Sequence, residues 1–182
     1  MERIIKPCST QYKTASLDLV EKVFTDYENT TEGKLVRRLA EEIRAKEFFV
    51  PELELIMTNE VDEIIGYAMF SRFHIEKKYT EELLLLSPVA VKTELQRQHI
   101  SKELIEYGFE KAGKLGYKAV LVEGNPQNYR ARGFKTAADY DIYASEKIHL
   151  PHIECLMVRE LVPGALEHIH GIVDYGFYET LA

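Results

Sequence analysis

Cysteine, basic charge and long apolar runs are all scarce in this sequence, and each scarcity excludes a class of protein. The chain of 182 residues has only two cysteines, Cys8 and Cys155, so no disulfide framework is expected. No window approaches 18 uninterrupted apolar residues, which argues against a membrane-spanning helix. The first ten residues, MERIIKPCST, lack the apolar core of a signal peptide. We therefore expect a protein of the reducing cytoplasm.

Basic residues are outnumbered by acidic ones. The chain has 23 lysines and arginines against 30 aspartates and glutamates, which gives a formal net charge of −7. Nonspecific binding of nucleic acid needs a basic surface, so this balance argues against a nucleic-acid partner. The negative charge mildly favours cationic small molecules, although most such charge is only a solvated surface.

Several catalytic and binding motifs are also absent. The sequence has no GxxxxGK[ST] phosphate loop, no GxGxxG after a strand, and no evident nucleophile elbow or Ser-His-Asp order. Zinc-ligand residue types do occur, at His149 and His152 with Cys155 and at His168 and His170. Their spacing fits no standard zinc site, so we expect no metal.

The elements that are present favour one α/β domain. With 46% hydrophobic residues, the chain is long enough to bury one sizeable core. A short strand at RIIKP is followed by two helical stripes, and the second carries Leu35, Leu39 and Ile43. The run from Phe48 to Ile75 looks like an antiparallel hairpin around the turn TNEVDE.

The middle of the chain predicts a strand–helix–strand unit. LLLLSPVAV, residues 83–91, is continuously apolar, as in a strand covered on both faces, and Pro88 inside it requires a bulge or a break in pairing. The following helix places Gly108 on its buried face, which suggests close packing against the sheet. Gly116 ends that helix, and YKAVLV forms the next strand. The two strands should be parallel, with a right-handed crossover.

The junction QRQHIS, residues 96–101, lies where ligands bind in such sheets, at the carboxyl end of the first strand. A helix start offers unpaired N–H groups and a partial positive charge. Arg97 and His99 could add side-chain donors to an anion site there. The alternative is a merely solvated helix start, because every helix has one.

These segments resemble the core of GNAT-superfamily N-acetyltransferases. Gln96 matches the first position of the family's Q/R-x-x-G-x-G/A loop, and Tyr129 stands five residues before Phe134 of a Gly-Phe pair. The stretch EGNPQNYRARGF, residues 123–134, resembles that of a subgroup of predicted small-molecule acetyltransferases. The late MVRELVPGAL resembles the last core strand of that subgroup and its L-V-P-G-A-L ending.

The resemblance implies a fold. The expected architecture is α/β of the α+β type, a single GNAT-like domain with a mixed, twisted sheet of six or seven strands. Helices should cover both faces, and the two central parallel strands should splay near Pro88. The domain is expected to span residues 1–160, with residues 161–182 as a C-terminal extension packed on it.

The resemblance also implies a reaction, the direct transfer of an acetyl group from acetyl-CoA to a primary amine of a small molecule or peptide. Tyr129 would protonate the departing thiolate as general acid. Glu82, Glu123 and Asp141 are available as general base, but the sequence selects none of them. The residues that the resemblance assigns to the cofactor are Val89, Ala90, Val91, Gln96, Arg97, Gln98, His99, Ile100, Ser101 and Asn125.

The chain departs from the family at several of these positions. His99 and Ser101 occupy the two small positions of the loop, and Asn125, Asn128 and Ala131 replace the subgroup's Asp, Tyr and Arg. We expect His99 to adopt helical torsions, which histidine tolerates. These departures keep a second reading open, a non-catalytic module that binds acyl-CoA. The aromatic tail at residues 175–178 packs in the core, packs between copies, or forms a wall of the acceptor site, and a homodimer is left open too.

Overall fold

The computed structural model describes residues 2–182 and divides them into two compact units that interleave along the chain. The first unit holds the chain up to Ser71 together with Ser87–Lys111, and the second holds Arg72–Leu86 together with Ala112–Ala182. Strand β4, Leu83–Val91, belongs to both units, because the division falls between Leu86 and Ser87. The strands are hydrogen-bonded in the order β1-β2-β3-β4-β5-β8-β6, which confirms the predicted mixed sheet.

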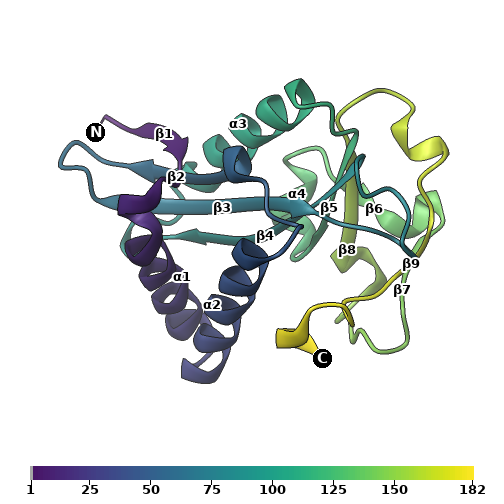
Figure 1. Cartoon of the computed structure of the whole chain (residues 1–182), viewed down its shortest axis with the longest axis horizontal. Helices are drawn as coiled ribbons and strands as arrows, with labels where there is room; N and C mark the ends of the chain where they lie inside the picture. Colours follow the sequence, from purple (N-terminus) through teal and green to yellow (C-terminus); the bar gives the residue numbers. More distant parts are fainter. Residues whose placement is uncertain (1) are drawn as a thin grey trace. The chain divides into compact units, whose positions relative to one another are not determined.

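The first unit is an antiparallel meander with helices on both of its faces. β2 pairs with β1 on one side and with β3 on the other, and the turn between β2 and β3 is the predicted TNEVDE. Figure 1 shows α1 and α2 side by side on one face of these strands and α3 on the other. The elements are β1 Ile4–Pro7, α1 Lys13–Tyr27, α2 Thr30–Ala45, β2 Glu54–Thr58, β3 Ile64–Arg72 and α3 Ile100–Lys114.

Alternation along β3 explains this arrangement, because successive side chains point to opposite faces of a strand. Gly66 and Phe70 face α3, and a Cβ added at Gly108 would lie 2.2 Å from Phe70 Cε2. Gly108 therefore lets the helix approach the sheet closely, as its place in the sequence predicted. Tyr67 points to the opposite face, where its hydroxyl donates to Glu54 beneath the side chains of α1 and α2.

The second unit is built around β5, Ala119–Glu123. Leu83–Leu85 of β4 run parallel to Ala119–Leu121, which confirms the predicted parallel pair. On its other side β5 is antiparallel to β8, and β6 pairs in turn with β8. A separate pair of short strands is parallel. The remaining elements are α4 Pro126–Arg130, β6 Lys135–Thr136, β7 Ile142–Ala144, β8 Leu156–Glu160 and β9 Gly171–Val173.

Among residues 2–182, no helix combines the length and the apolar character that a membrane crossing requires.

Candidate active site

The hydrogen-bonded pairing between β4 and β5 ends well before β4 itself does. The last paired residues are Leu85 and Leu121, although β4 continues to Val91. Pro88 follows three residues after the last pair, where the sequence predicted a break, because proline cannot donate to a strand ladder. Beyond it Val89 and Val91 are partly exposed, whereas Ala90 is buried.

The loop between β4 and α3 has an unusual backbone. Arg97 and His99 both have left-handed torsions, with φ of +64° and +65°. The expectation that His99 adopts helical torsions is wrong. The helix begins one residue later, at Ile100, and the His99 carbonyl accepts its first hydrogen bond, from the Glu103 amide at 3.0 Å. A left-handed conformation costs a residue with a Cβ about 1–2 kcal/mol, which explains why glycine suits this position.

Three contacts hold this strained loop in place. The Gln96 side-chain amide donates to the Val91 carbonyl at 3.3 Å, so this side chain folds back on the end of β4. Arg3, which precedes β1, donates from Nη1 to the Gln98 carbonyl at 2.9 Å and to a Glu103 carboxylate oxygen at 3.2 Å. Sequence reasoning missed Arg3, because no local pattern links residue 3 to residue 98.

Two features of this loop suit the binding of an anion. These are the main-chain amides at the start of α3 and the positive charge of the Arg97 side chain. The first amides of α3 have no partner within the helix, and the helix dipole favours negative charge there. Gln96, Arg97, Gln98 and His99 are all exposed. Within residues 2–182 the Arg97 guanidinium has no acidic partner. Ile100 is buried, so only its main chain can serve a ligand, and Ser101 is partly buried in the first turn.

The torsion of His99 leads to a prediction about stability. Replacing His99 with glycine should raise the free energy of unfolding by up to about 1 kcal/mol, because relief of left-handed strain outweighs the added freedom of the unfolded chain. The matched control is Gln98→Gly, which has no positive φ to relieve and should lose about 0.4–1 kcal/mol. Urea unfolding of both variants measures the difference. Equal losses would show that position 99 is not strained.

Tyr129 lies on the short helix α4 in the second unit. Asn125, which the resemblance assigns to the cofactor, caps this helix: its side-chain oxygen accepts from the Gln127 amide at 3.0 Å. The ring of Tyr129 lies against Gly124, where an added Cβ would meet Tyr129 Cε2 at 2.5 Å. On another side the ring meets Phe134 edge-on at 5.6 Å. Glycine at 124 and phenylalanine at 134 therefore fix the direction of the tyrosine.

The Tyr129 hydroxyl has the properties of a proton donor. Burial raises the pKa of Tyr129 above its usual value near 10, so the hydroxyl stays protonated at neutral pH. Within residues 2–182 this hydroxyl makes no hydrogen bond, which leaves it available to a ligand.

The three candidate bases lie in different surroundings. Glu82 directly precedes β4 and pairs with His168 at 3.0 Å and Lys118 at 3.5 Å. The hydrogen bond from His168 lowers the pKa of Glu82 and makes it a weaker base. Asp141 follows the turn after β6. Glu123 is the last residue of β5, next to the glycine that the Tyr129 ring covers.

The histidines and cysteines singled out in the sequence do not assemble. Within residues 2–182 no three side chains of His, Cys, Asp or Glu gather in a way that could hold a metal ion. His152 instead accepts from the Glu154 amide in a short turn, and His168 meets Glu82.

Comparisons with known proteins agree with this architecture. The sequence model of the acetyltransferase (GNAT) family matches residues 17–137, more than half of the chain. The Escherichia coli (strain K12) protein named uncharacterized N-acetyltransferase YhbS is 29% identical over 150 residues, which cover 82% of this chain and 83% of that protein.

Solved structures show the same fold. The E. coli YhbS structure in complex with CoA superposes with a TM-score of 0.80 at 22% identity and covers 96% of this chain and 90% of that one. A GNAT family acetyltransferase from Brucella melitensis, in complex with acetyl-CoA, has a TM-score of 0.72 at 22% identity and covers 96% of both chains. The predicted resemblance is thereby confirmed, and this chain belongs to the acetyltransferase (GNAT) family.

Proposed function

We propose that this protein transfers an acetyl group from acetyl-CoA to a primary amine of a small molecule or peptide. The observation that carries the donor site is the loop with left-handed torsions at Arg97 and His99, which leads directly into the first turn of α3. Such amides bind pyrophosphate without further machinery. The E. coli and Brucella relatives, whose structures contain CoA and acetyl-CoA, support the same donor.

The proposed cofactor contacts follow the chain. The main chain of Val89 and Val91 holds the pantetheine arm as a pseudo-strand, since pairing with β5 has ended at Leu85. The amides that follow His99 take the pyrophosphate, and the exposed Arg97 guanidinium adds positive charge. Gln96 contributes by shaping the loop, because its amide is bonded to Val91.

The proposed reaction is a direct acyl transfer. The amine nitrogen, after losing a proton, attacks the thioester carbonyl carbon, so that a C–N bond forms and the C–S bond breaks. Main-chain N–H groups can stabilise the negative charge that develops on the carbonyl oxygen. Tyr129 gives its proton to the departing CoA thiolate, and the second proton of the nitrogen restores the tyrosine through solvent.

One observation favours the alternative function, an acyl-CoA-binding module without turnover. His99 places a bulky side chain at a left-handed position where the family has a small residue. An imidazole that blocked the phosphates would weaken the donor site. The affinity for acetyl-CoA, measured in wild type and in His99→Gly, distinguishes these two functions. If only the glycine variant bound acetyl-CoA, His99 would block the donor site, and the protein would not be an active acetyltransferase.

Acetyl-CoA is expected to stabilise the folded chain. At 100 times its dissociation constant, a ligand that binds only the native state adds about 2.7 kcal/mol, which corresponds to roughly 5–10 °C in melting temperature. Thermal unfolding with millimolar acetyl-CoA measures the shift, and AMP, which lacks the pyrophosphate, is the control ligand. If acetyl-CoA neither changed the melting temperature nor gave any heat of binding in calorimetry, it would not be the acetyl donor. A screen of amines, followed by CoA release, then tests transfer itself.

A further inference from the structure

Arg3 connects the start of the chain to the loop that precedes α3. Its Nη1 donates to the Gln98 carbonyl at 2.9 Å and to a Glu103 carboxylate oxygen at 3.2 Å. The Arg3 side chain is 20% exposed, so most of it lies against the protein. All three residues belong to the first unit. Arg3 therefore fixes the direction of one carbonyl in the loop, that of the peptide between Gln98 and His99.

The same peptide carries the His99 amide. This peptide is trans, and the N–H and C=O groups of a planar trans peptide point in opposite directions. Because the carbonyl points to Arg3, the His99 N–H points away from it. Within residues 2–182 this N–H has no acceptor, and His99 is exposed. The His99 amide is thus a main-chain donor available to a ligand, directly before the first turn of α3.

The strain at His99 favours the opposite orientation of this peptide. His99 has φ of +65°, which is costly for a residue with a Cβ. Turning the peptide over would move this φ to the negative values that histidine prefers. The compensating rotation would fall on ψ of Gln98, which has no positive φ and tolerates either value. The Gln98 carbonyl would then replace the His99 N–H, and an acceptor would face the phosphates where a donor is needed.

The hydrogen bond from Arg3 opposes this rearrangement. A charged donor makes a stronger hydrogen bond than a neutral one, and its free energy is of the same order as the strain of one left-handed residue. Glu103 also pairs with the guanidinium, and its own amide donates to the His99 carbonyl at 3.0 Å. A glycine at position 99 would need no such support, because glycine adopts positive φ without strain.

We propose that Arg3 is a positioning residue of the acetyl-CoA site. By holding the Gln98 carbonyl, it keeps the His99 N–H directed at the pyrophosphate despite the side chain at position 99. This inference rests on the proposed function and adds a residue to it. Arg3 acts through the loop and not on the ligand, and the need for it follows from His99, which stands where the family has a small residue.

The affinity for acetyl-CoA, measured by calorimetry in a double-mutant cycle, tests this role. Arg3→Met should raise the Kd about tenfold, because only the fraction of molecules that keeps the strained orientation then binds. His99→Gly should rescue this loss. The double variant should bind within about threefold of wild type, since glycine adopts either orientation with similar ease. If His99→Gly left the loss unchanged, Arg3 would act on the ligand itself, and the inference would be wrong.

Two further variants separate the charge of Arg3 from its hydrogen bond. Arg3→Met combined with Glu103→Gln restores the net charge but not the hydrogen bond to Gln98, so the tenfold loss should persist. Full recovery would show that Arg3 serves only as a charge and would refute the inference. Lys102→Met is the matched control, because Lys102 lies in the same turn of α3 and pairs with Glu106. Rescue of this variant too by His99→Gly would show that the rescue is not specific to Arg3.

The melting temperature of the ligand-free protein gives a second cycle, which separates this inference from the proposed function. His99→Gly should raise the melting temperature by up to about 4 °C in wild type, but not in Arg3→Met, where the peptide has already turned over. Additive changes would overturn the inference whether or not acetyl-CoA binds. If wild type bound no acetyl-CoA but the cycle was coupled as expected, the proposed function would be wrong, and the hold of Arg3 on the loop would be confirmed.

Discussion

Replacing Tyr129 with phenylalanine is expected to slow acetyl transfer by about 10²–10⁴ while leaving the fold and the affinity for acetyl-CoA intact. The substitution removes one hydroxyl, and within residues 2–182 that hydroxyl has no hydrogen bond to lose. The ring keeps its contacts with Gly124 and Phe134. The expected loss is therefore chemical, because the thiolate would leave without a proton donor.

Steady-state kinetics of wild type and Tyr129→Phe, with CoA release as the signal, measure this effect. The control is Tyr143→Phe, which removes the hydroxyl of an exposed tyrosine elsewhere in the second unit and should keep full activity. A Tyr129→Phe protein with wild-type turnover at every pH would remove this residue from the mechanism. The elevated pKa of Tyr129 means that wild type should not lose its proton donor below about pH 10.

Removing Arg44 is expected to cost about 3–5 kcal/mol of stability, because a fully buried carboxylate then loses one of the two cations that pair with it. The Glu54 side chain is fully buried on β2. Its oxygens accept from Arg44 Nε at 2.6 Å and from the Tyr67 hydroxyl at 2.6 Å, and Lys13 completes the network. Burial and the nearby Glu54 charge hold the pKa of Tyr67 well above its usual value, so this hydroxyl remains a donor.

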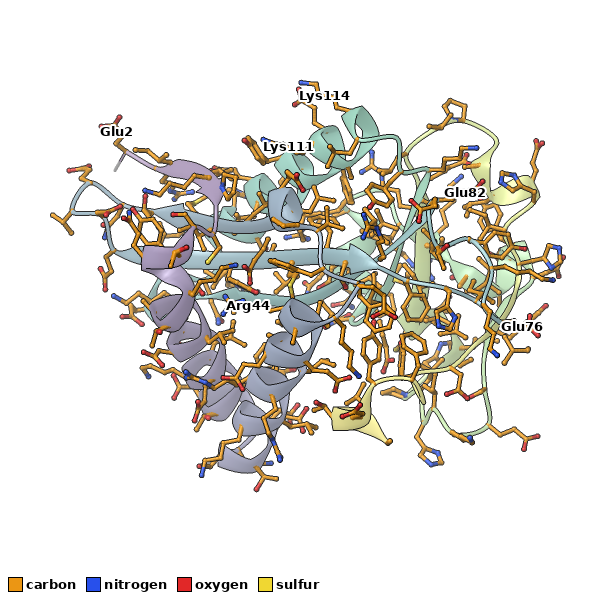
Figure 2. All side chains as sticks on the ribbon, viewed as in Figure 1. Glu2, Arg44, Glu76, Glu82, Lys111 and Lys114 are labelled. Atoms are coloured by element: carbon orange, nitrogen blue, oxygen red, sulfur yellow. The ribbon has the colours of Figure 1, made fainter. Side chains whose placement is uncertain are left out.

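Arg44 also links the helices to the strand. Besides Glu54, it donates to the Lys13 carbonyl at 3.1 Å and to Ser16 Oγ at 2.9 Å, both on α1. Figure 2 shows Arg44 directed from α2 toward the strands. One side chain thus connects α1, α2 and β2, and its loss should loosen all three contacts together.

Urea unfolding of Arg44→Met measures this loss, which corresponds to roughly 6–20 °C in melting temperature. Arg37→Met is the matched control on the same helix. Arg37 pairs with Asp18, Glu21 and Glu41, but these acids are 30–62% exposed, so the loss should stay within about 1 kcal/mol. If the two substitutions destabilised the protein equally, burial of the Glu54 carboxylate would not be the reason for the large effect expected at Arg44. Adding Glu54→Leu to Arg44→Met should restore part of the stability, since the stranded charge is then gone.

The sequence by itself determined the elements and the family. Continuous apolar runs identified β4 and β5, and a helical stripe with Gly108 on its buried face identified α3, because periodicity reports directly which side of an element is buried. The order of these elements and the spacing of Tyr129 before Phe134 then sufficed for the GNAT resemblance, which the family match confirms. Pro88 located the end of β4–β5 pairing within three residues, since proline removes a specific hydrogen-bond donor.

Only the tertiary structure decided how the residues of the candidate site are held. The left-handed torsions at Arg97 and His99 depend on how the loop closes between β4 and α3, and no local preference of either residue indicates them. The Arg3–Gln98 and Tyr175–Glu123 hydrogen bonds join residues 95 and 52 positions apart. Periodicity describes neighbours one or two turns away, whereas these contacts exist because the folded chain returns to the same place.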